Sequence, residues 1–560
     1  MANVTDSSSL LVVPSGWSDG VLGSLKPDDG SGDFTFSRGS DLSATRVNED
    51  GYIEKGYENL LLQSNSFTTS PWLITNSDPI SGQQGYDGTN NAWQLNAVGT
   101  GNYRRIIYPL SITDVYTFSI YAKANTANVL VLWDTSGSNR TYFDLSQTEP
   151  SNVVALQQGG IELSPKAEDV GNGWWRLSMS FARSSNNDFW IFPVNEVGNT
   201  LCNDGDGVYI QDAMASQGLV TYPYISTIGA IGKGGILEDQ PRIDYTGNNG
   251  SLFIEDNKTN LIKHSEFFEG GTISGINALH LSTFTFLSPE NFKNATALIE
   301  NTANTEHYWF SERMTQPTTE NLVSTIFVKP NGRTKIRFWN YHLSNQNARV
   351  DIDLTTNTIS NIADGNVSFV FASVTDYPNG WKRVEIQTIK TTSTYSYGIR
   401  INLLNDNGND VYVGDGESGV LIYGAQMETG VYKPSSYIPT YGTSSTRAKE
   451  SATLTKNVAA TGTIYININA DSTKTLTFLG GNVSVTQGVN KIALAYSPTA
   501  LKISHNGSIV QNIARAFDTS SLTEIQLGHR NNFEQTTDSI NQFLTLDSFL
   551  TDTELNELTA

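Results

Sequence analysis

The chain contains two related halves, and this duplication limits its architecture more than any other feature. The matching segments are NLLLQSNSF (from Asn59) and NLIKHSEFF (from Asn260), SIYAK (to Lys123) and TIFVK (to Lys329), NGWWR (from Asn172) and NGWKR (from Asn379), and YIST (from Tyr224) and YIPT (from Tyr437). The matches occur in the same order in both halves. A collinear set of repeated motifs predicts two copies of one structural unit.

The pattern within each half is typical of an all-β fold. Short apolar and polar alternations, such as VYTFSIYAK in the first half and TKIRFWN in the second, are separated by Gly, Asn and Asp. No long segment shows a sustained helical apolar period. We therefore expect two tandem antiparallel β-sandwiches of jelly-roll type.

Residues 448–560 follow a different pattern and predict a third, smaller β-sandwich. KIALAYS, LKISHNGSIV and EIQLGHR alternate as strands do, and Asn506-Gly507 is suited to a tight hairpin turn. Thr551 and Glu554 have the spacing of a capping box, which predicts one short terminal helix. The expected divisions are an N-terminal arm (1–55), the first sandwich (56–230), a linker (231–256), the second sandwich (257–447) and the third (448–560).

Charge and composition argue against several classes of protein. The chain of 560 residues has 56 acidic and 35 basic residues, a net charge of −21, so a phosphate backbone would be repelled and no nucleic-acid partner is expected. We expect no membrane insertion and no signal peptide, since long apolar runs and a basic leader are lacking. The single cysteine, Cys202, excludes an intrachain disulfide and is expected to be a buried apolar residue.

Four motifs of the chain resemble segments of known protein families. FSRGSDLSATRVNEDGYIE (36–54), the segment PRIDYT to HSE (241–266) and the segment GDGESG to TSSTRA (414–448) resemble parts of phage fibre and appendage proteins. The ending from Phe543 to Leu555 is similar to that of laminin-G or concanavalin-like lectin folds. The resemblance implies a virion protein made in the host cytoplasm, an N-terminal arm docked on other virion proteins, carbohydrate-binding-like modules for a host surface glycan, and a homo-oligomer, with a trimer favoured.

No pattern in the chain predicts catalysis. Paired carboxylates of a glycosidase, a zinc-binding histidine pair and a Gly-x-Ser-x-Gly elbow are not apparent, so we expect no enzyme and no catalytic residues. Asp204, Asp206 and Asp415 lie beside glycines in turn sequences. They are expected to form turns, with a calcium site as the alternative and no other cofactor.

Aromatic side chains on polar strand faces are the candidates for glycan binding. In residues 334–339, alternation places Ile336 and Phe338 on one face and Arg337 and Trp339 on the other, with Tyr341 continuing the second face. The alternative for Trp339 is packing beneath a loop or at a subunit contact. Trp309 and Trp190 are further candidates for a groove, whereas Trp133, Trp174 and Trp381 are expected to be buried.

Three functions are compatible with these features. The first is an adhesive virion protein, such as a head fibre, tail fibre or tail appendage. The second is a purely architectural capsid or collar protein, and the third is a polysaccharide depolymerase. The second copy matches the phage pattern more closely than the first, so we expect copy one to be scaffold, and copy two and the lectin-like third unit to face outward.

Overall fold

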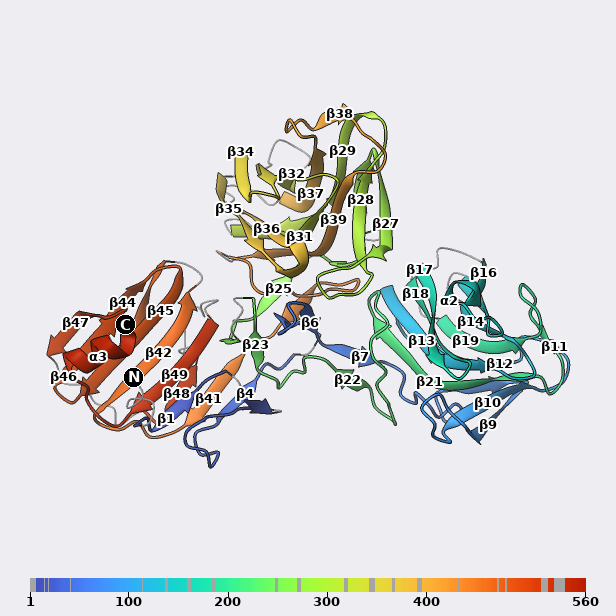
Figure 1. The fold of residues 1–560 in the computed structure, drawn as a ribbon, viewed down its shortest axis with the longest axis horizontal. Helices are drawn as coiled ribbons and strands as arrows, with labels where there is room; N and C mark the ends of the chain where they lie inside the picture. The colour runs from blue at the N-terminus through green and yellow to red at the C-terminus, as the bar shows by residue number, and fades with distance from the viewer. Residues whose placement is uncertain are drawn as a thin grey trace.

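Three β-sandwich lobes surround a central junction of connecting segments in the computed structural model (Figure 1). The structure describes residues 7–14, 16–18, 20–40, 42–112, 114–135, 139–158, 163–183, 187–246, 250–268, 273–316, 321–341, 348–364, 368–389, 395–430, 433–470, 473–478, 481–514, 522–527 and 539–560. Strands make up almost all of the regular structure in each lobe, which confirms the all-β prediction.

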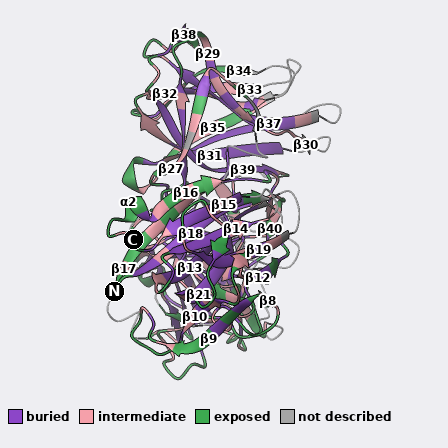
Figure 2. Ribbon diagram, turned by 90° about the vertical axis from the view of Figure 1, so that its right-hand side faces the viewer, coloured by how far each residue is buried: buried purple, intermediate pink, exposed green. Residues whose placement is uncertain are grey.

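The first lobe, called copy one, packs two six-stranded sheets face to face. The β13 sheet has the order β17 (Leu163–Gly171), β18 (Trp174–Arg183), β13 (Asp114–Ala124), β21 (Gly207–Gln217), β10 (Ala92–Ala97) and β9 (Ser77–Gln83). The β14 sheet has the order β16 (Val154–Gln158), β15 (Asn139–Asp144), β14 (Val129–Asp134), β19 (Asn187–Val194), β12 (Arg105–Leu110) and β8 (Leu73–Thr75). Central strands such as β13 and β18 are largely buried, whereas the edge strands β9 and β16 are more exposed (Figure 2).

The second lobe, called copy two, repeats this strand order in both sheets. Its β31 sheet runs β35 (Ser368–Asp376), β36 (Lys382–Ile389), β31 (Asn321–Asn331), β39 (Gly419–Thr429), β28 (Ala295–Glu300) and β27 (Leu279–Phe286). Its β32 sheet runs β34 (Thr358–Asp364), β33 (Ala348–Asp353), β32 (Lys335–Tyr341), β37 (Tyr395–Leu404), β29 (Asn304–Ser311) and β26 (Ile273–Asn277), with β30 (Met314–Gln316) paired to β37 and β38 (Val411–Val413) to β29. The equal topology confirms the duplication.

The repeated sequence motifs close each sandwich in the same way. The Asn59 side-chain amide donates to the carbonyls of Ala213 and Ile225, and its oxygen accepts from backbone amides. In copy two, Asn260 donates to the carbonyls of Ala425 and Ile438. The motif asparagine therefore fastens the entering segment to the last long strand and to the departing segment in both copies.

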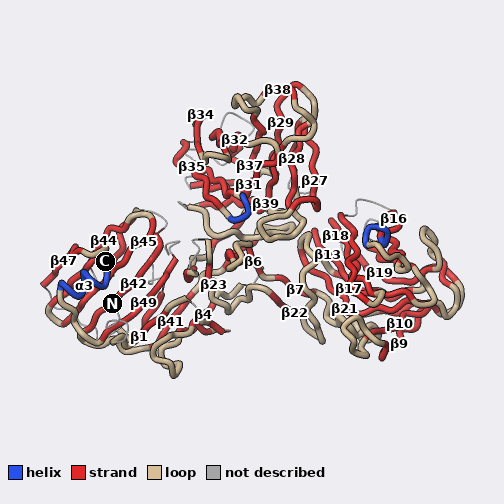
Figure 3. Tube along the Cα trace, viewed as in Figure 1, coloured by secondary structure: helices blue, strands red, loops and turns tan. Residues whose placement is uncertain are grey.

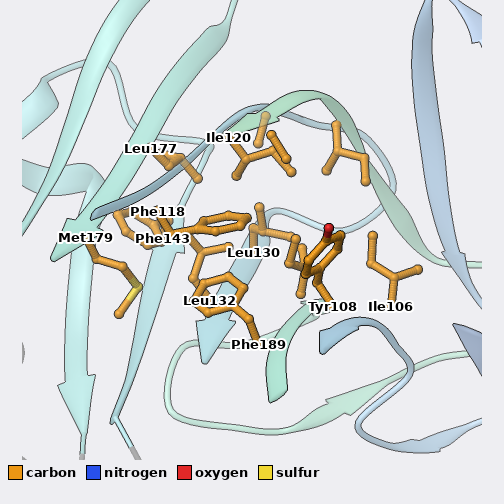
Figure 4. Packing of buried hydrophobic residues seen from close by; sticks show 14 of the residues in the cluster. Ile106, Tyr108, Phe118, Ile120, Leu130, Leu132, Phe143, Leu177, Met179 and Phe189 are labelled. Atoms are coloured by element: carbon orange, nitrogen blue, oxygen red, sulfur yellow. The ribbon is translucent and has the colours of Figure 1, made fainter. Parts of the chain in front are cut away.

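Each sandwich is filled by side chains from both of its sheets. In copy one, Phe118 and Leu177 of the β13 sheet pack against Leu130, Phe143 and Phe189 of the β14 sheet (Figure 4). Phe118 and Phe189 stack with ring centroids 3.9 Å apart. Burial of these apolar surfaces is the main force that holds the two sheets together.

Buried positions expected from the sequence are largely confirmed. Trp174 is 2% exposed, Trp381 is 1% exposed and Cys202 is fully buried. Trp133 is only half-buried, because it lies on the outer face of the β14 sheet.

The third sandwich draws its strands from three separate parts of the chain. One sheet runs β23 (Arg242–Asp244), β24 (Ser251–Phe253), β49 (Ser539–Leu546), β42 (Gly462–Ala470), β45 (Gly488–Ser497), β46 (Ala500–His505) and β47 (Ser508–Ala514), and β1 (Leu10–Val12) also pairs with β49. The other sheet runs β2 (Trp17–Ser18), β3 (Val21–Leu22), β4 (Phe34–Ser37), β41 (Ser451–Thr455) and β48 (Glu524–Leu527), and β43 (Lys474–Phe478) and β44 (Gly481–Val485) form a hairpin.

This arrangement corrects the expected domain boundaries. The sequence predicts an arm at 1–55 and a linker at 231–256, but β1 and β4 (Figure 1) as well as β23 and β24 are integral strands of the third sandwich. Leu10, Leu22 and Phe34 are fully buried in its core. Residues 448–560 alone would expose the apolar side chains that these N-terminal residues cover.

Helices in the described part of the chain are short. They are α2 (Pro150–Val153), the 3-10 turn η1 (Pro378–Gly380) and α3 (Asp552–Thr559), shown in blue in Figure 3. The capping box of α3 is present, with the Thr551 hydroxyl oxygen accepting from the Glu554 amide. Asn506 and Gly507 join β46 to β47 with positive φ angles of 47° and 83°, so the predicted tight turn is confirmed as well.

A buried ionic cluster, which we call the hub, joins copy two to the third sandwich. It consists of Arg38, Arg242, Glu255, Arg447 and Glu450, whose side chains are at most 4% exposed. Arg242 holds Glu450 through two hydrogen bonds of 2.7 and 2.5 Å and contacts Glu255 at 2.7 Å. Arg38 donates to Glu450 at 3.0 Å.

A second buried cluster lies between the two copies. The Lys55 ammonium is 2.6 Å from a Glu266 carboxylate oxygen and 2.7 Å from a Glu290 oxygen. The hydroxyls of Tyr423 and Tyr437 also donate to Glu266, each at 2.9 Å. Paired charges therefore fix the hairpin of β5 (Thr45–Val47) and β6 (Ile53–Lys55) to copy two, while the Tyr222 ring of copy one lies 6.0 Å from the same ammonium.

Candidate binding face

The outer face of the β32 sheet in copy two gathers aromatic and arginine side chains from three adjacent strands. On β32, Ile336 and Phe338 are fully buried in the core, whereas Arg337, Trp339 and Tyr341 lie on the opposite, partly exposed face. The predicted alternation is therefore confirmed.

Arg400 on β37 organises this face. It is the cross-strand partner of Trp339, and its guanidinium lies 3.9 Å from the Tyr308 ring centroid and 5.3 Å from those of Trp339 and Tyr341. Its Nε donates to Asn402 at 2.7 Å, and Glu306 accepts from Nη2 at 3.1 Å. Arg400 is only 8% exposed, so these cation–π contacts are largely desolvated and hold the rings in place.

The aromatic rings form a connected surface, which we call the platform. It consists of Tyr308, Phe310, Trp339 and Tyr341. Phe310 and Tyr341 lie 5.3 Å apart, Trp339 and Tyr341 lie 6.4 Å apart, and Arg349 is 4.9 Å from the Trp339 ring. Among the described residues, no group accepts a hydrogen bond from the buried Trp339 Nε1. The platform thus offers ring faces with polar groups around them.

Arg337 has a supporting place beside the platform. Its guanidinium donates to both oxygens of Asp351, at 2.6 and 3.1 Å, and also to Asp410. Hydrogen bonding to Asp351 raises the pKa of Arg337 above its ordinary value. The guanidinium of Arg337 is therefore paired with two carboxylates, those of Asp351 and Asp410. Arg349 and Arg400, instead, are the arginines that contact the Trp339 ring.

Trp309 is corrected as a candidate binding residue. It is fully buried and packs edge-on against Phe268 with centroids 5.3 Å apart. Its neighbours Tyr308 and Phe310 point to the opposite side of β29, where the platform lies. The period of two along a strand could have identified this, since Trp309 alternates with both residues.

Copy one has an aromatic face at the equivalent place. Trp190 is the cross-strand partner of Trp133, as Arg400 is of Trp339, and the two indoles lie 4.9 Å apart. Arg105 covers the Trp190 ring at 3.7 Å and Arg140 lies 5.0 Å from the Trp133 ring. Trp190 is therefore half-buried beneath an arginine, on a face that also contains valines, Tyr103, Tyr142, Leu156 and Phe192.

The acidic residues considered for calcium serve as turn acceptors. Asp204 accepts from the Gly99 amide at 2.6 Å, and Asp206 accepts from the Asn195 and Asn203 side chains. Asp415 accepts from the amides of Glu417 and Ser418. Within the described ranges, no three His, Cys, Asp or Glu side chains come together in a way that could hold a metal ion.

The sequence did not reveal the hub. Three of the motifs quoted in the sequence analysis supply four of its five residues: Arg38 lies in 36–54, Arg242 and Glu255 in 241–266, and Arg447 in 414–448, whereas Glu450 follows the last motif. These segments are far apart along the chain. The hydrogen bonds between their side chains in the folded structure explain why each segment contains a charged residue. Part of the motif pattern thus has a structural role.

Comparisons with known proteins identify no family for the chain. No family model matches the chain, and no curated protein matches it. A tandem domain, CBM22-1-CBM22-2, from the N-terminus of Paenibacillus barcinonensis Xyn10C is similar over 70% of this chain and 99% of its own length, at 12% identity and a TM-score of 0.20. In the described part of the chain, no helix is long and apolar enough to cross a membrane. The sheets themselves establish the chain as an all-β protein of sandwich lobes.

Proposed function

We propose that the chain is a non-enzymatic bacteriophage virion protein that binds a host surface glycan through the platform of copy two. The observation that carries the glycan proposal is the set of Trp339, Tyr308 and Tyr341 held around the buried guanidinium of Arg400. Rigid aromatic faces with nearby hydrogen-bonding groups are suited to the apolar face and the hydroxyls of a sugar ring.

The virion assignment is supported by the motifs at 36–54, 241–266 and 414–448. A fibre, tail or capsid appendage that repeats in several copies would multiply weak binding at each platform. We propose a homo-oligomer, with a trimer favoured, for this reason.

The test is a glycan array probed with the full chain and with Trp339→Ala. We expect at least a tenfold loss of binding for this variant, about 1.4 kcal/mol, because an aromatic anchor contributes at least that much at a binding site. Trp17→Ala is the matched control, since this indole is 38% exposed on the third sandwich, away from the platform. Equal binding by Trp339→Ala and the wild type would refute the platform.

Two further outcomes separate the alternative functions. Absence of binding to any glycan, by a folded wild-type chain, would favour an architectural capsid or collar protein. Release of reducing ends from host polysaccharide would favour a depolymerase and contradict the non-enzymatic proposal.

A further inference from the structure

A cleft of about 580 Å³ separates copy two from the third sandwich. One wall is the outer face of the β31 sheet, so the cleft and the platform are on opposite sheets of copy two. The other wall comes from the third sandwich, including Asn469, Gln487 and Ser539. Sites for small ligands commonly have volumes of 300–1,000 Å³ and lie at domain interfaces.

The copy-two wall carries polar side chains in register across three strands. Thr325 on β31 and Ser373 on β35 are both cross-strand partners of Glu385 on β36. Two residues before Glu385 on β36, Arg383 has Phe327 of β31 and Thr375 of β35 as its cross-strand partners. The guanidinium of Arg383 lies 5.6 Å from the Phe327 ring centroid. The wall therefore combines hydroxyls, charged groups and an aromatic ring.

Glu385 is the unusual group in this wall. It is only 7% exposed, and one carboxylate oxygen accepts from the Ser373 hydroxyl at 2.7 Å. The other oxygen, Oε1, has no hydrogen-bond donor among the described residues. Burial raises the pKa of this carboxyl above its ordinary value. A buried acceptor without a donor costs free energy, which a ligand hydroxyl would recover.

The acidic groups of the neighbouring hub differ from Glu385 in this respect. Glu255 also lines the cleft, but it accepts from Arg242, Ser436 and the Ser436 amide. Glu450 accepts from Arg38, from Arg242 and from the Glu255 amide. The lack of a donor is thus particular to Glu385 and is not a general feature of buried acids at this junction.

Copy one has no counterpart to this acid. The motif NGWWRLS aligns with NGWKRVE, so Ser178 stands where copy two has Glu385. Arg176, which corresponds to Arg383, donates to the backbone carbonyl of Tyr222. In copy one the chain itself thus provides a partner for this arginine, whereas in copy two Arg383 lines the cleft.

We propose that the cleft is a second saccharide site, separate from the platform. Glu385 accepts hydrogen bonds from ligand hydroxyls, and Phe371, which is 43% exposed in the same wall, contacts a face of the sugar ring. Amides of Asn469 and Gln487 contact the ligand from the third sandwich. Because both lobes contribute, the site exists only in the assembled chain.

The test uses isothermal titration of the full chain with maltotriose, xylotriose and chitotriose. Measurements in the Trp339→Ala variant remove the platform contribution. We expect this variant to bind at least one probe with a stoichiometry of one, and Glu385→Gln in the same background to weaken binding by about tenfold or more. Glu238→Gln is the matched control, because Glu238 lies outside the cleft and is half-exposed.

The failures of the two proposed sites are distinguishable. If Glu385→Gln leaves the affinity of the Trp339→Ala background unchanged, or if Trp339→Ala alone abolishes all binding, the cleft proposal is overturned and the platform stands. If Trp339→Ala binds every probe as the wild type does while Glu385→Gln weakens binding, the cleft stands and the platform is overturned. Absence of binding for all probes at millimolar concentration overturns the cleft as a site for these saccharides.

Discussion

Replacement of Glu450 by glutamine tests whether the hub holds copy two and the third sandwich together. The Glu450 carboxylate accepts four hydrogen bonds: from Arg38 at 3.0 Å, from Arg242 at 2.7 and 2.5 Å, and from the Glu255 amide at 2.9 Å. Glutamine has almost the same shape but no charge. Its amide group would also place hydrogens against the donors of an arginine.

The expected cost is about 3–5 kcal/mol, the usual range when one partner of a buried ion pair is removed. Three arginines and two glutamates form the hub, so neutralising Glu450 leaves three buried cations against the single charge of Glu255. The value lies toward the upper end of the range, because the side chains of Arg38, Arg242 and Glu450 are all 0% exposed and water cannot replace the lost carboxylate.

Hydrogen exchange measured by mass spectrometry is the suitable assay, because it reports each lobe separately. Glu450→Gln should lower the opening free energy of β41 and β24 and leave β13 of copy one unchanged. Glu54→Gln is the control: its pair with Arg46 is partly exposed, at 33% and 19%, and should contribute at most about 1 kcal/mol. A loss below about 1 kcal/mol for Glu450→Gln, equal to the control, would refute the structural role of the hub.

The pH dependence gives an independent check on the same group. Burial by itself would raise the pKa of Glu450, but Arg242 and Arg38 outweigh it and hold the pKa below the ordinary value of 4.5. A lowered pKa means that the ionised carboxylate stabilises the folded state above pH 4.5 and that this stabilisation is lost as the pH falls further. The wild type should therefore lose stability in acid more steeply than Glu450→Gln.

Three other predictions concern different parts of the chain. Burial and Glu266 raise the pKa of Glu290 from 4.5 to about 7 despite Lys55, so the folded state favours the neutral acid. The free energy of unfolding therefore falls as the pH rises from 4.5 toward 7. Glu290→Gln should raise the melting temperature at pH 8 and have little effect at pH 5. Leu10→Ala should cost about 2–5 kcal/mol in hydrogen exchange of β49 and β42, whereas an N-terminal arm outside the sandwich would give no change. Thr551→Ala should cost about 1 kcal/mol in denaturant unfolding of the third sandwich, and an unchanged midpoint would contradict the role of the capping box.

Local pattern was sufficient to predict most of the strand content and one part of the platform. Alternation placed Arg337, Trp339 and Tyr341 on one face because side chains of a strand point to opposite sides in turn. The same rule would have selected Arg400 between the buried Ile399 and Ile401, and Tyr308 in place of Trp309. Residue type alone favoured tryptophan over these neighbours, and the prediction of Trp309 was therefore wrong.

The sequence by itself determined the duplication, the all-β class and the faces of individual strands, since these depend on repeats and on neighbours along the chain. Only the tertiary structure decided that β1, β4, β23 and β24 complete the third sandwich, because pairing between residues as distant as Leu11 and Leu544 leaves no local signal. The hub has the same origin: its charges are stable in the interior only when segments far apart in the chain bring their partners within hydrogen-bonding distance.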